Sequence, residues 1–164
     1  MELRDISMDD LPLWEKLQCD PVMMAELGGP RAKEDMPKVL QNTLDYIETG
    51  RGWSYKIVVD GVGVGSVAVW ESDWDGQPIN EIGWMVLPDY QGRGLATQAV
   101  REVLDKARTT GRWDVIHAFP GVTNAASNAI CRKAGFRQLG ECDIDFADRI
   151  LRCNHWMIDV KNRK

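Results

Sequence analysis

The chain has 164 residues, a formal net charge of −5 and a sequence pI near 5.1. This length is typical of one domain, and we predict a single domain over residues 1–164. Hydrophobic residues make up 44% of the chain and charged residues 27%, a balance that argues against a disordered protein. The excess of acidic residues argues against a partner bound through nucleic-acid phosphates, and it slightly favours a cationic substrate.

The spacing of cysteines and histidines excludes the common metal motifs. The four cysteines form no C-x-x-C pair, and the two histidines form no H-E-x-x-H helix. We therefore expect no metal. Two interpretations of Cys142 and Cys153 stay open: they face each other across a terminal hairpin, or they are simply reduced, half-buried thiols.

The sequence shows no targeting or membrane-spanning segment. Residues 1–10 lack the apolar stretch of a signal peptide, and no run approaches the roughly 20 apolar residues that cross a bilayer. We expect a soluble cytoplasmic protein with no membrane partner.

The first 50 residues predict a strand followed by two helices. Residues 2–6 alternate like a strand, and Ser7 is a candidate helix cap with Asp10 three residues further on. Proline and paired glycines predict a loop over residues 20–31. A second amphipathic helix is expected over residues 33–48.

The rest of the chain mixes strands and helices. In chain order we predict strands 53–59 and 62–70 joined by an Asp60-Gly61 turn, a polar loop 71–78, strand 79–87, helix 98–108, strand 113–119, helix 125–134, strand 137–142, an acidic turn and strand 150–160. Gly61, Gly63 and Gly65 resemble the start of a dinucleotide fingerprint, but no helix follows them. The order of elements predicts an α+β, or mixed α/β, domain.

The segment from residue 84 to residue 97 has the features of a phosphate-binding turn. A strand ends near Leu87 and a helix begins near Gly94, with Gly92 and Arg93 between them. Glycines let the backbone turn sharply, and a helix N-terminus offers unpaired N–H groups to an anion. Many turns of this kind bind nothing, so both interpretations are open at this point. The turn is not a P-loop, because no Gly-Lys-Ser/Thr follows it.

Two motifs in this order resemble the GNAT superfamily of acyl-CoA-dependent N-acetyltransferases. Residues 91–96, Gln-Gly-Arg-Gly-Leu-Ala, fit the family's Q/R-x-x-G-x-G/A pattern, and residues 124–136 are similar to its N-x-x-S/A…K-x-G-F helix. The residues of the second motif are most similar to those of the branch that contains ribosomal-protein N-terminal acetyltransferases. The resemblance implies the GNAT fold, a mostly antiparallel sheet of about seven strands flanked by about four helices.

The resemblance also implies a site for acetyl-CoA as the acyl-donor co-substrate. The backbone of Trp84, Met85 and Val86 would pair with the pantetheine arm where the strand separates from its neighbour. The pyrophosphate would be held by the segment Gln91, Gly92, Arg93, Gly94, Leu95, Ala96 and Thr97. Asn124 and Asn128 would lie close to the pantetheine, although Asn124 could equally cap its helix and Met85 could be plain core.

Several groups are candidates for proton transfer. Glu81 lies on the strand of the expected pantetheine contacts and is the first choice for the base, with His117 or water as alternatives. Some relatives carry their glutamate one residue earlier, where this chain has Asn80, and Glu81 could instead bind a cationic substrate. The family's tyrosine acid falls on Cys131, which could also be inert packing. Ser127, one turn earlier, could hydrogen-bond the leaving sulfur, or water could protonate it.

The expected function is acetyl-CoA-dependent N-acetylation of a primary amine, on a small molecule or a protein N-terminus, by direct attack in a ternary complex. The alternative is a non-catalytic acyl-CoA-binding or regulatory module of the same fold. Residues 20–34, 71–78 and 143–149 are expected to form the acceptor site, with Trp70 and Trp74 beside it. The acidic residues of these segments favour a cationic acceptor, or are simply solvated. A homodimer is expected from the family, in which dimers are common.

Overall fold

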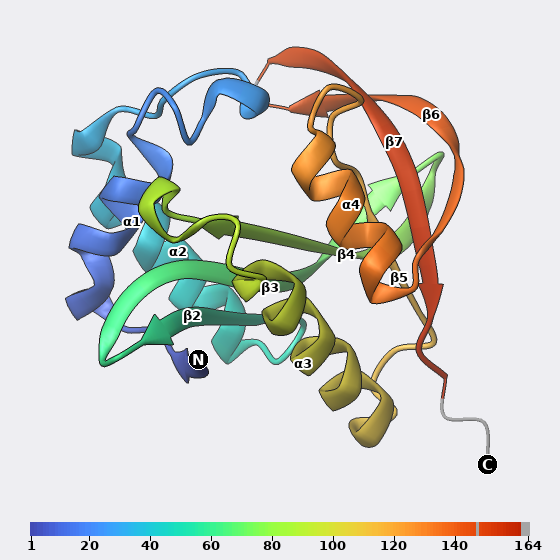
Figure 1. Ribbon diagram of the computed structural model, residues 1–164, viewed down its shortest axis with the longest axis horizontal. Coiled ribbons are helices and arrows are strands. Elements are labelled where there is room, and N and C mark those ends of the chain that lie inside the picture. The colour runs from blue at the N-terminus through green and yellow to red at the C-terminus, as the bar shows by residue number, and fades with distance from the viewer. Residues whose placement is uncertain (147, 162–164) are drawn as a thin grey trace.

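The computed structural model describes residues 1–146 and 148–161, and it confirms the predicted α+β fold with a seven-stranded sheet. Positions 147 and 162–164, which fall inside the predicted domain and tail, lie outside the described residues. Helices and strands follow one another along the chain as shown in Figure 1: β1 (Glu2–Asp5), α1 (Leu11–Gln18), α2 (Met36–Glu48), β2 (Trp53–Val59), β3 (Val62–Trp74), β4 (Gln77–Val86), α3 (Leu95–Thr110), β5 (Val115–Ala118), α4 (Ala125–Ala134), β6 (Arg137–Phe146) and β7 (Arg149–Asp159).

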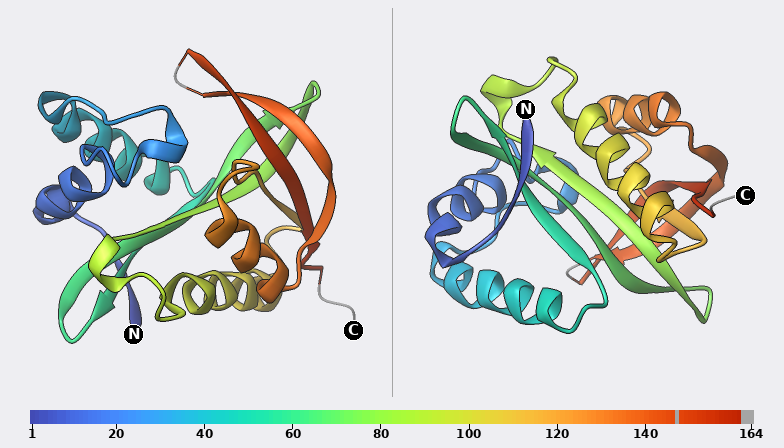
Figure 2. Two further views of the ribbon diagram at one scale, coloured as in Figure 1. Left: turned by 45° about the horizontal axis from the view of Figure 1, so that its top comes forward. Right: turned by 90° about the horizontal axis from the view of Figure 1, so that it is seen from below.

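The strands lie in the order β1-β2-β3-β4-β5-β7-β6. Neighbouring strands are antiparallel except for β4 and β5, which are parallel. Helices α1 and α2 cover one face of this sheet, and α3 and α4 cover the other (Figure 2). None of the described helices is both long enough and apolar enough to cross a lipid bilayer.

Each face of the sheet has its own apolar core. The larger core includes Ile82 and Val86 of β4, the buried side of α3, and Trp156 of β7. The smaller core joins Trp14 and Leu17 of α1 to Leu40 of α2. Because side chains alternate along a strand, β4 contributes to both cores and presents Glu81, Gly83 and Met85 on the α1–α2 side.

The ends of the first helices follow local chemistry. Ser7 and Asp10 form the predicted capping box, in which the Ser7 side chain accepts from the Asp9 N–H and Asp10 accepts from the Ser7 N–H. The helix expected over residues 33–48 begins with a 3-10 turn at Lys33–Asp35, and α2 starts at Met36. Pro37 fits there because a helix leaves its first N–H groups unpaired.

The predicted polar loop over residues 71–78 is wrong. Strand β3 continues to Trp74 and β4 begins at Gln77, so a tight turn at Asp75 and Gly76 joins them. Both turn residues have positive φ, 49° and 73°, as the tight turns of hairpins require. The polar residues suggested a loop, but they occur here because this hairpin extends beyond the core and its strands are exposed to solvent.

The predicted acidic turn is also shorter than expected. Asp143 and Asp145 belong to β6, and of the acidic residues assigned to the turn only Asp148 lies outside the strands. Cys142 and Cys153 are register partners across this hairpin, and both are buried free thiols. Burial raises the pKa of the Cys153 thiol to about 11, which keeps it protonated near neutral pH.

Candidate active site

Strands β4 and β5 separate at the centre of the sheet. Glu81 and His117 form the one register pair that joins them among the described residues, yet β4 continues to Val86. Figure 1 shows β4 running on beyond the position of β5. The edge of β4 after Glu81 therefore lacks a strand partner on the β5 side. Main-chain groups on such an edge can pair with an extended ligand as if it were an added strand.

A set of unpaired backbone donors follows directly after β4. None of the six N–H groups from Gly92 to Thr97 has a hydrogen-bond partner within residues 1–146 and 148–161. Gly92 and Gly94 have φ of 74° and 75°, and a Cβ built on either would meet no atom within 4 Å. The space over this turn is open, and the N-terminus of α3 points its N–H groups and positive dipole end into it.

Two side chains hold this turn in place. Gln91 Nε2 donates to the carbonyl oxygen of Val86 at 2.8 Å, and Arg93 Nη2 donates to the carbonyl oxygen of Asp89 at 3.0 Å. The guanidinium of Arg93 also lies 5.1 Å from the centre of the Tyr90 ring. The N–H of Gln91 is bonded to the Pro88 carbonyl, so the set of free donors begins at Gly92 and not at Gln91.

Glu81 lies on the α1–α2 face of β4, five residues before this strand ends at Val86, at the point where β4 and β5 separate. Its side chain is half-buried, and desolvation by its surroundings raises its pKa to about 7, partly offset by a hydrogen bond with Ser72. A carboxyl with this pKa exchanges protons near neutral pH, which suits a general base. Asn80, the alternative position in the family, points to the other face by strand alternation.

Sequence reasoning missed most of an aromatic cluster next to Glu81. His117 Nδ1 lies 2.8 Å from His155 Nε2, and Phe119 and Trp74 stack or pack edge-on against these rings. Burial lowers the pKa of both histidines, which favours their neutral forms. His117, named as an alternative base, is thus hydrogen-bonded to a second histidine. The sequence signal for this contact was side-chain alternation along β7. His155 lies two residues from Met157, the register partner of His117, and so shares the face of His117.

A cavity of about 210 Å³ opens at Glu81. Ser72, Trp74 and Phe119 line it together with three acidic residues, Asp73, Asp143 and Asp145. Asp143 forms an ion pair with Arg152 at 3.1 Å. The predicted acceptor segments 71–78 and 143–149 therefore do meet at one cavity, although both belong largely to strands.

Asn124 and Asn128 have clear structural roles. The side chain of Asn124 accepts from the Ser127 N–H and caps α4, the alternative interpretation of this residue. Asn128 is buried; its amide nitrogen donates to the carbonyls of Gly121 and Asn124, and its oxygen accepts from Asn154 and Trp156. These four bonds use the whole hydrogen-bonding capacity of the Asn128 amide, which leaves none for a cofactor.

Cys131 does not fit the role of a catalytic acid. Its side chain is fully buried in the larger core, and burial raises its pKa to about 12. A group that touches no solvent-accessible space cannot reach a leaving thiolate. Ser127, one turn earlier on α4, is partly exposed and stays a candidate.

Replacing Cys131 by Ala is expected to leave kcat within about twofold of the unmodified protein. The same change should lower the melting temperature by a few degrees, because it removes a buried sulfur and leaves a small cavity. Steady-state kinetics and thermal denaturation measure the two effects. A loss of kcat above about tenfold at unchanged stability would restore Cys131 as the acid.

The segment between α1 and α2, residues 20–34, lies against three parts of the site. Thr123 donates to the Glu26 carboxylate at 2.7 Å, and Gln91 Nε2 lies 3.9 Å from the sulfur of Met23. A Cβ on Gly28 would lie 3.3 Å from the Arg149 side chain. In Figure 1 this blue segment reaches across toward α4 and the β6–β7 hairpin. The prediction that it borders the site agrees with these contacts.

The comparison with known families agrees with the geometry. The family model described as "Acetyltransferase (GNAT) domain" matches residues 1–137. The chain belongs to the GNAT acetyltransferase family. The resemblance inferred from the two motifs is thereby confirmed.

Solved structures share this GNAT fold at low sequence identity. RimL, a ribosomal L7/L12 α-N-protein acetyltransferase in complex with coenzyme A, is 18% identical over 98% of this chain and 94% of its own, with a TM-score of 0.84. Mycobacterium smegmatis RimJ, in complex with a coenzyme A disulfide, is 22% identical over 96% and 80%, with a TM-score of 0.80. Microcin C7 self-immunity acetyltransferase MccE, in complex with acetyl-CoA and AMP, is 16% identical over 96% and 91%, with a TM-score of 0.81.

Proposed function

We propose that this GNAT domain transfers an acetyl group from acetyl-CoA to a primary amine. The observation that carries the proposal is the run of six unpaired N–H groups from Gly92 to Thr97 beside the free edge of β4. Backbone donors at a helix N-terminus suit a pyrophosphate, and a free strand edge suits the amide-containing pantetheine arm. Coenzyme A or acetyl-CoA is present in the RimL, RimJ and MccE structures, which supports the same ligand here.

An acidic protein binds such a polyanion through local positive potential. Arg93 and the α3 dipole lie at the turn, while the acidic residues of the site line the cavity at Glu81. The global charge of −5 therefore does not oppose the ligand. No group of three or more potential metal ligands occurs in the part of the chain that the structure describes.

The proposed reaction is direct attack on the thioester. The amine nitrogen forms a bond to the carbonyl carbon, the C–S bond breaks, and the amine proton passes to the Glu81 carboxylate directly or through water. A strand N–H near Met85 would polarise the carbonyl oxygen. The thiolate leaves with a proton from water, with the Ser127 hydroxyl as its candidate hydrogen-bond partner.

The acceptor is a primary amine on a small molecule or a protein N-terminus. RimL is named as a protein α-N-acetyltransferase, and MccE is named as a self-immunity acetyltransferase in complex with acetyl-CoA and AMP, so neither acceptor class is favoured by these names alone. A non-catalytic module stays the alternative, because the position of the family's tyrosine holds the buried Cys131. Three further properties stay predictions from the sequence and its resemblance to the GNAT superfamily: a single domain, a cytoplasmic location and a homodimer.

Release of free thiol from acetyl-CoA across a panel of amines tests the proposal. We expect acetyl-CoA to bind and at least one primary amine to be acetylated, with the product identified by mass. Binding of acetyl-CoA without turnover of any amine would favour the non-catalytic module. A folded protein that does not bind acetyl-CoA would contradict both.

A further inference from the structure

A second, larger cavity lies on the α2 side of the sheet, and the proposed reaction does not account for it. Its volume is about 400 Å³, and it lies between α2 and strands β2 and β3. Trp70 of β3 lines this cavity and is also the register partner of Glu81. Ser72, two residues along the same strand, lines the smaller cavity. The two cavities share no lining residue, but Trp70 and Ser72 lie on the same face of β3 by strand alternation, which places the cavities next to each other along this strand.

The two aromatic walls of the larger cavity are placed over glycines. A Cβ on Gly83 would lie 2.8 Å from Cη2 of Trp70, so the indole crosses β4 directly above this residue, between Glu81 and Met85. A Cβ on Gly52 would lie 2.5 Å from Cε1 of Tyr46. A larger residue at either position would clash with the ring, and at Gly52 also with the backbone oxygen of Val69, 2.5 Å from the Cβ. The open volume thus depends on these two glycines.

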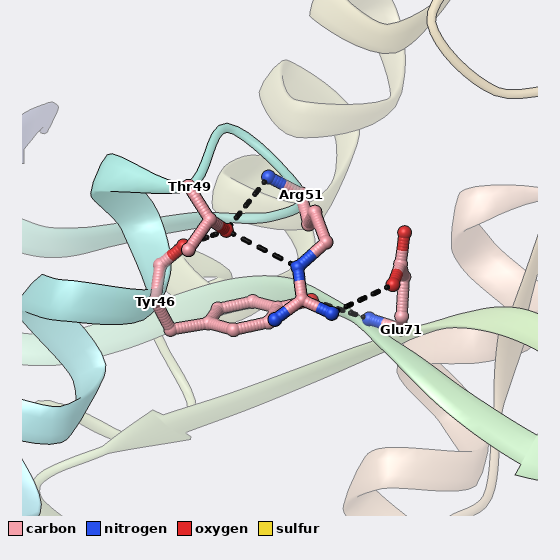
Figure 3. Close-up of polar contacts among 4 residues, drawn as sticks. All are labelled: Tyr46, Thr49, Arg51 and Glu71. Carbon is pink, nitrogen blue, oxygen red and sulfur yellow. Dashed lines mark hydrogen bonds and ion pairs between the residues drawn. The ribbon is translucent and has the colours of Figure 1, made fainter.

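Polar contacts fix the far wall of the cavity (Figure 3). The hydroxyl of Tyr46 accepts from the Glu71 N–H at 2.8 Å, and the guanidinium of Arg51 lies 5.2 Å from the Tyr46 ring centre. Arg51 also forms an ion pair with Glu71 at 3.5 Å, and Thr49 accepts from Arg51. The charge of Arg51 is therefore neutralised, and the ring is held from both sides.

Arg31 is the charged residue that lines the larger cavity. Its backbone N–H is bonded to the Gln18 carbonyl, which fixes the position of the residue. No carboxylate of residues 1–146 or 148–161 forms an ion pair with its guanidinium. Arg31 is solvent-exposed at the mouth of a cavity lined by Asn42, Thr43, Ser54 and aromatic rings, and an unpaired guanidinium there can bind a carboxylate or phosphate.

We infer that the acceptor is a primary amine whose apolar body occupies the cavity against Trp70 and Tyr46 and ends in an anionic group bound by Arg31. The amine end lies in the smaller cavity, where Glu81 and three aspartates favour a positive charge, and the anionic end lies toward the unpaired arginine. Asp143 is paired with Arg152, so the positive charge is favoured mainly by Glu81 and the other two aspartates. The charges of the two cavities thus orient the molecule. This inference rests on the proposed function and names the chemical class of its acceptor.

Three matched amines test the inference: 4-(aminomethyl)benzoate, its neutral amide 4-(aminomethyl)benzamide, and 1,4-diaminobutane. We expect 4-(aminomethyl)benzoate to have a KM about tenfold below that of 4-(aminomethyl)benzamide, with a similar kcat. The bond between its carboxylate and Arg31 is made equally in the ground state and the transition state, so it changes KM alone. Arg31→Gln should remove this difference. Arg137→Gln, which removes an exposed arginine on β6 outside both cavities, should retain it.

Calorimetry of the carboxylated amine with the coenzyme A-loaded protein gives a second readout that needs no turnover. A preference for the diamine, a carboxylate preference that survives Arg31→Gln, or no binding of the carboxylated amine would each overturn the inference. Binding of this amine and of acetyl-CoA without acetylation of any amine would overturn the proposed function alone.

Discussion

Replacing Glu81 by Gln is expected to lower kcat at least about 100-fold at pH 8 and to raise the stability of the fold at the same pH. The loss of activity follows from removing the base, since general-base catalysis typically contributes 10²–10⁴-fold. In the unmodified protein kcat/KM should rise with pH through an inflection near 7, the pKa that burial gives to Glu81 in the free protein. The variant should lack this inflection. A pH–rate profile of both proteins measures the effect.

The gain in stability has the same physical origin. The pKa of Glu81 is raised from its ordinary value of 4.5 to about 7, so the folded protein holds this proton more tightly than the unfolded chain does. Stability therefore falls as pH rises from 4.5 to 7, and above pH 7 the buried carboxylate costs on the order of 3 kcal/mol. Glutamine has no charge to bury. Denaturant unfolding at pH 8 should therefore show a more stable variant, with little difference at pH 4.5.

Glu48→Gln is the matched control for this pair of measurements, because Glu48 is an exposed carboxylate at the end of α2. It should change neither the pH profile nor the stability at pH 8. If Glu81→Gln retains most of the activity, His117 or water acts as the base. If it is less stable than the unmodified protein at pH 8, the hydrogen bond with Ser72 outweighs the cost of burying the carboxylate.

Replacing Gly94 by Val is expected to weaken acetyl-CoA binding at least about 100-fold while the protein still folds. The new side chain would project into the open space above the α3 N-terminus and exclude a pyrophosphate from the unpaired N–H groups. A non-glycine residue at φ 75° costs about 1–2 kcal/mol, so the melting temperature should fall by about 3–6 °C. Isothermal titration with coenzyme A measures the affinity, and thermal denaturation confirms the fold.

Gly111→Val supplies the control for backbone strain. Gly111 ends the same helix, has φ of 61° and would also place a Cβ in open space, but it lies at the opposite end of α3. The two variants should lose similar stability, and only Gly94→Val should lose coenzyme A. Equal affinities in the two variants would show that the turn before α3 is not the coenzyme A site.

Local sequence features predicted the regular elements well. Helix α4 and strand β2 have their predicted bounds, and the Ser7 cap forms as its spacing suggested. The predicted loop over residues 71–78 failed because polar residues occur both in loops and in the solvated part of a long hairpin. Ser72 and Trp74 are in a strand and line a cavity because β4 pairs with them. Local composition does not show which distant segment will pair with these residues.

The same distinction applies to the site. The turn with Gly92 and Gly94 is a local structure, so its motif could be read directly from neighbouring residues. The predicted catalytic role of Cys131 conflicts with its burial, because a position in a motif does not report burial and α4 turns this residue into the core. The His117–His155 contact joins β5 and β7, which only the strand order of the sheet brings together.

By itself the sequence determined the fold class, the family and the turn that can hold a pyrophosphate, because each depends on residues close together in the chain. The tertiary structure alone decided which face of the sheet carries Glu81, which motif residues are buried, and how α2 and β3 enclose a cavity with an unpaired Arg31. These properties depend on packing between distant segments. The net charge of −5 has a local meaning only in the folded protein, where acidic residues line the cavity at Glu81 and Arg31 lines the larger one.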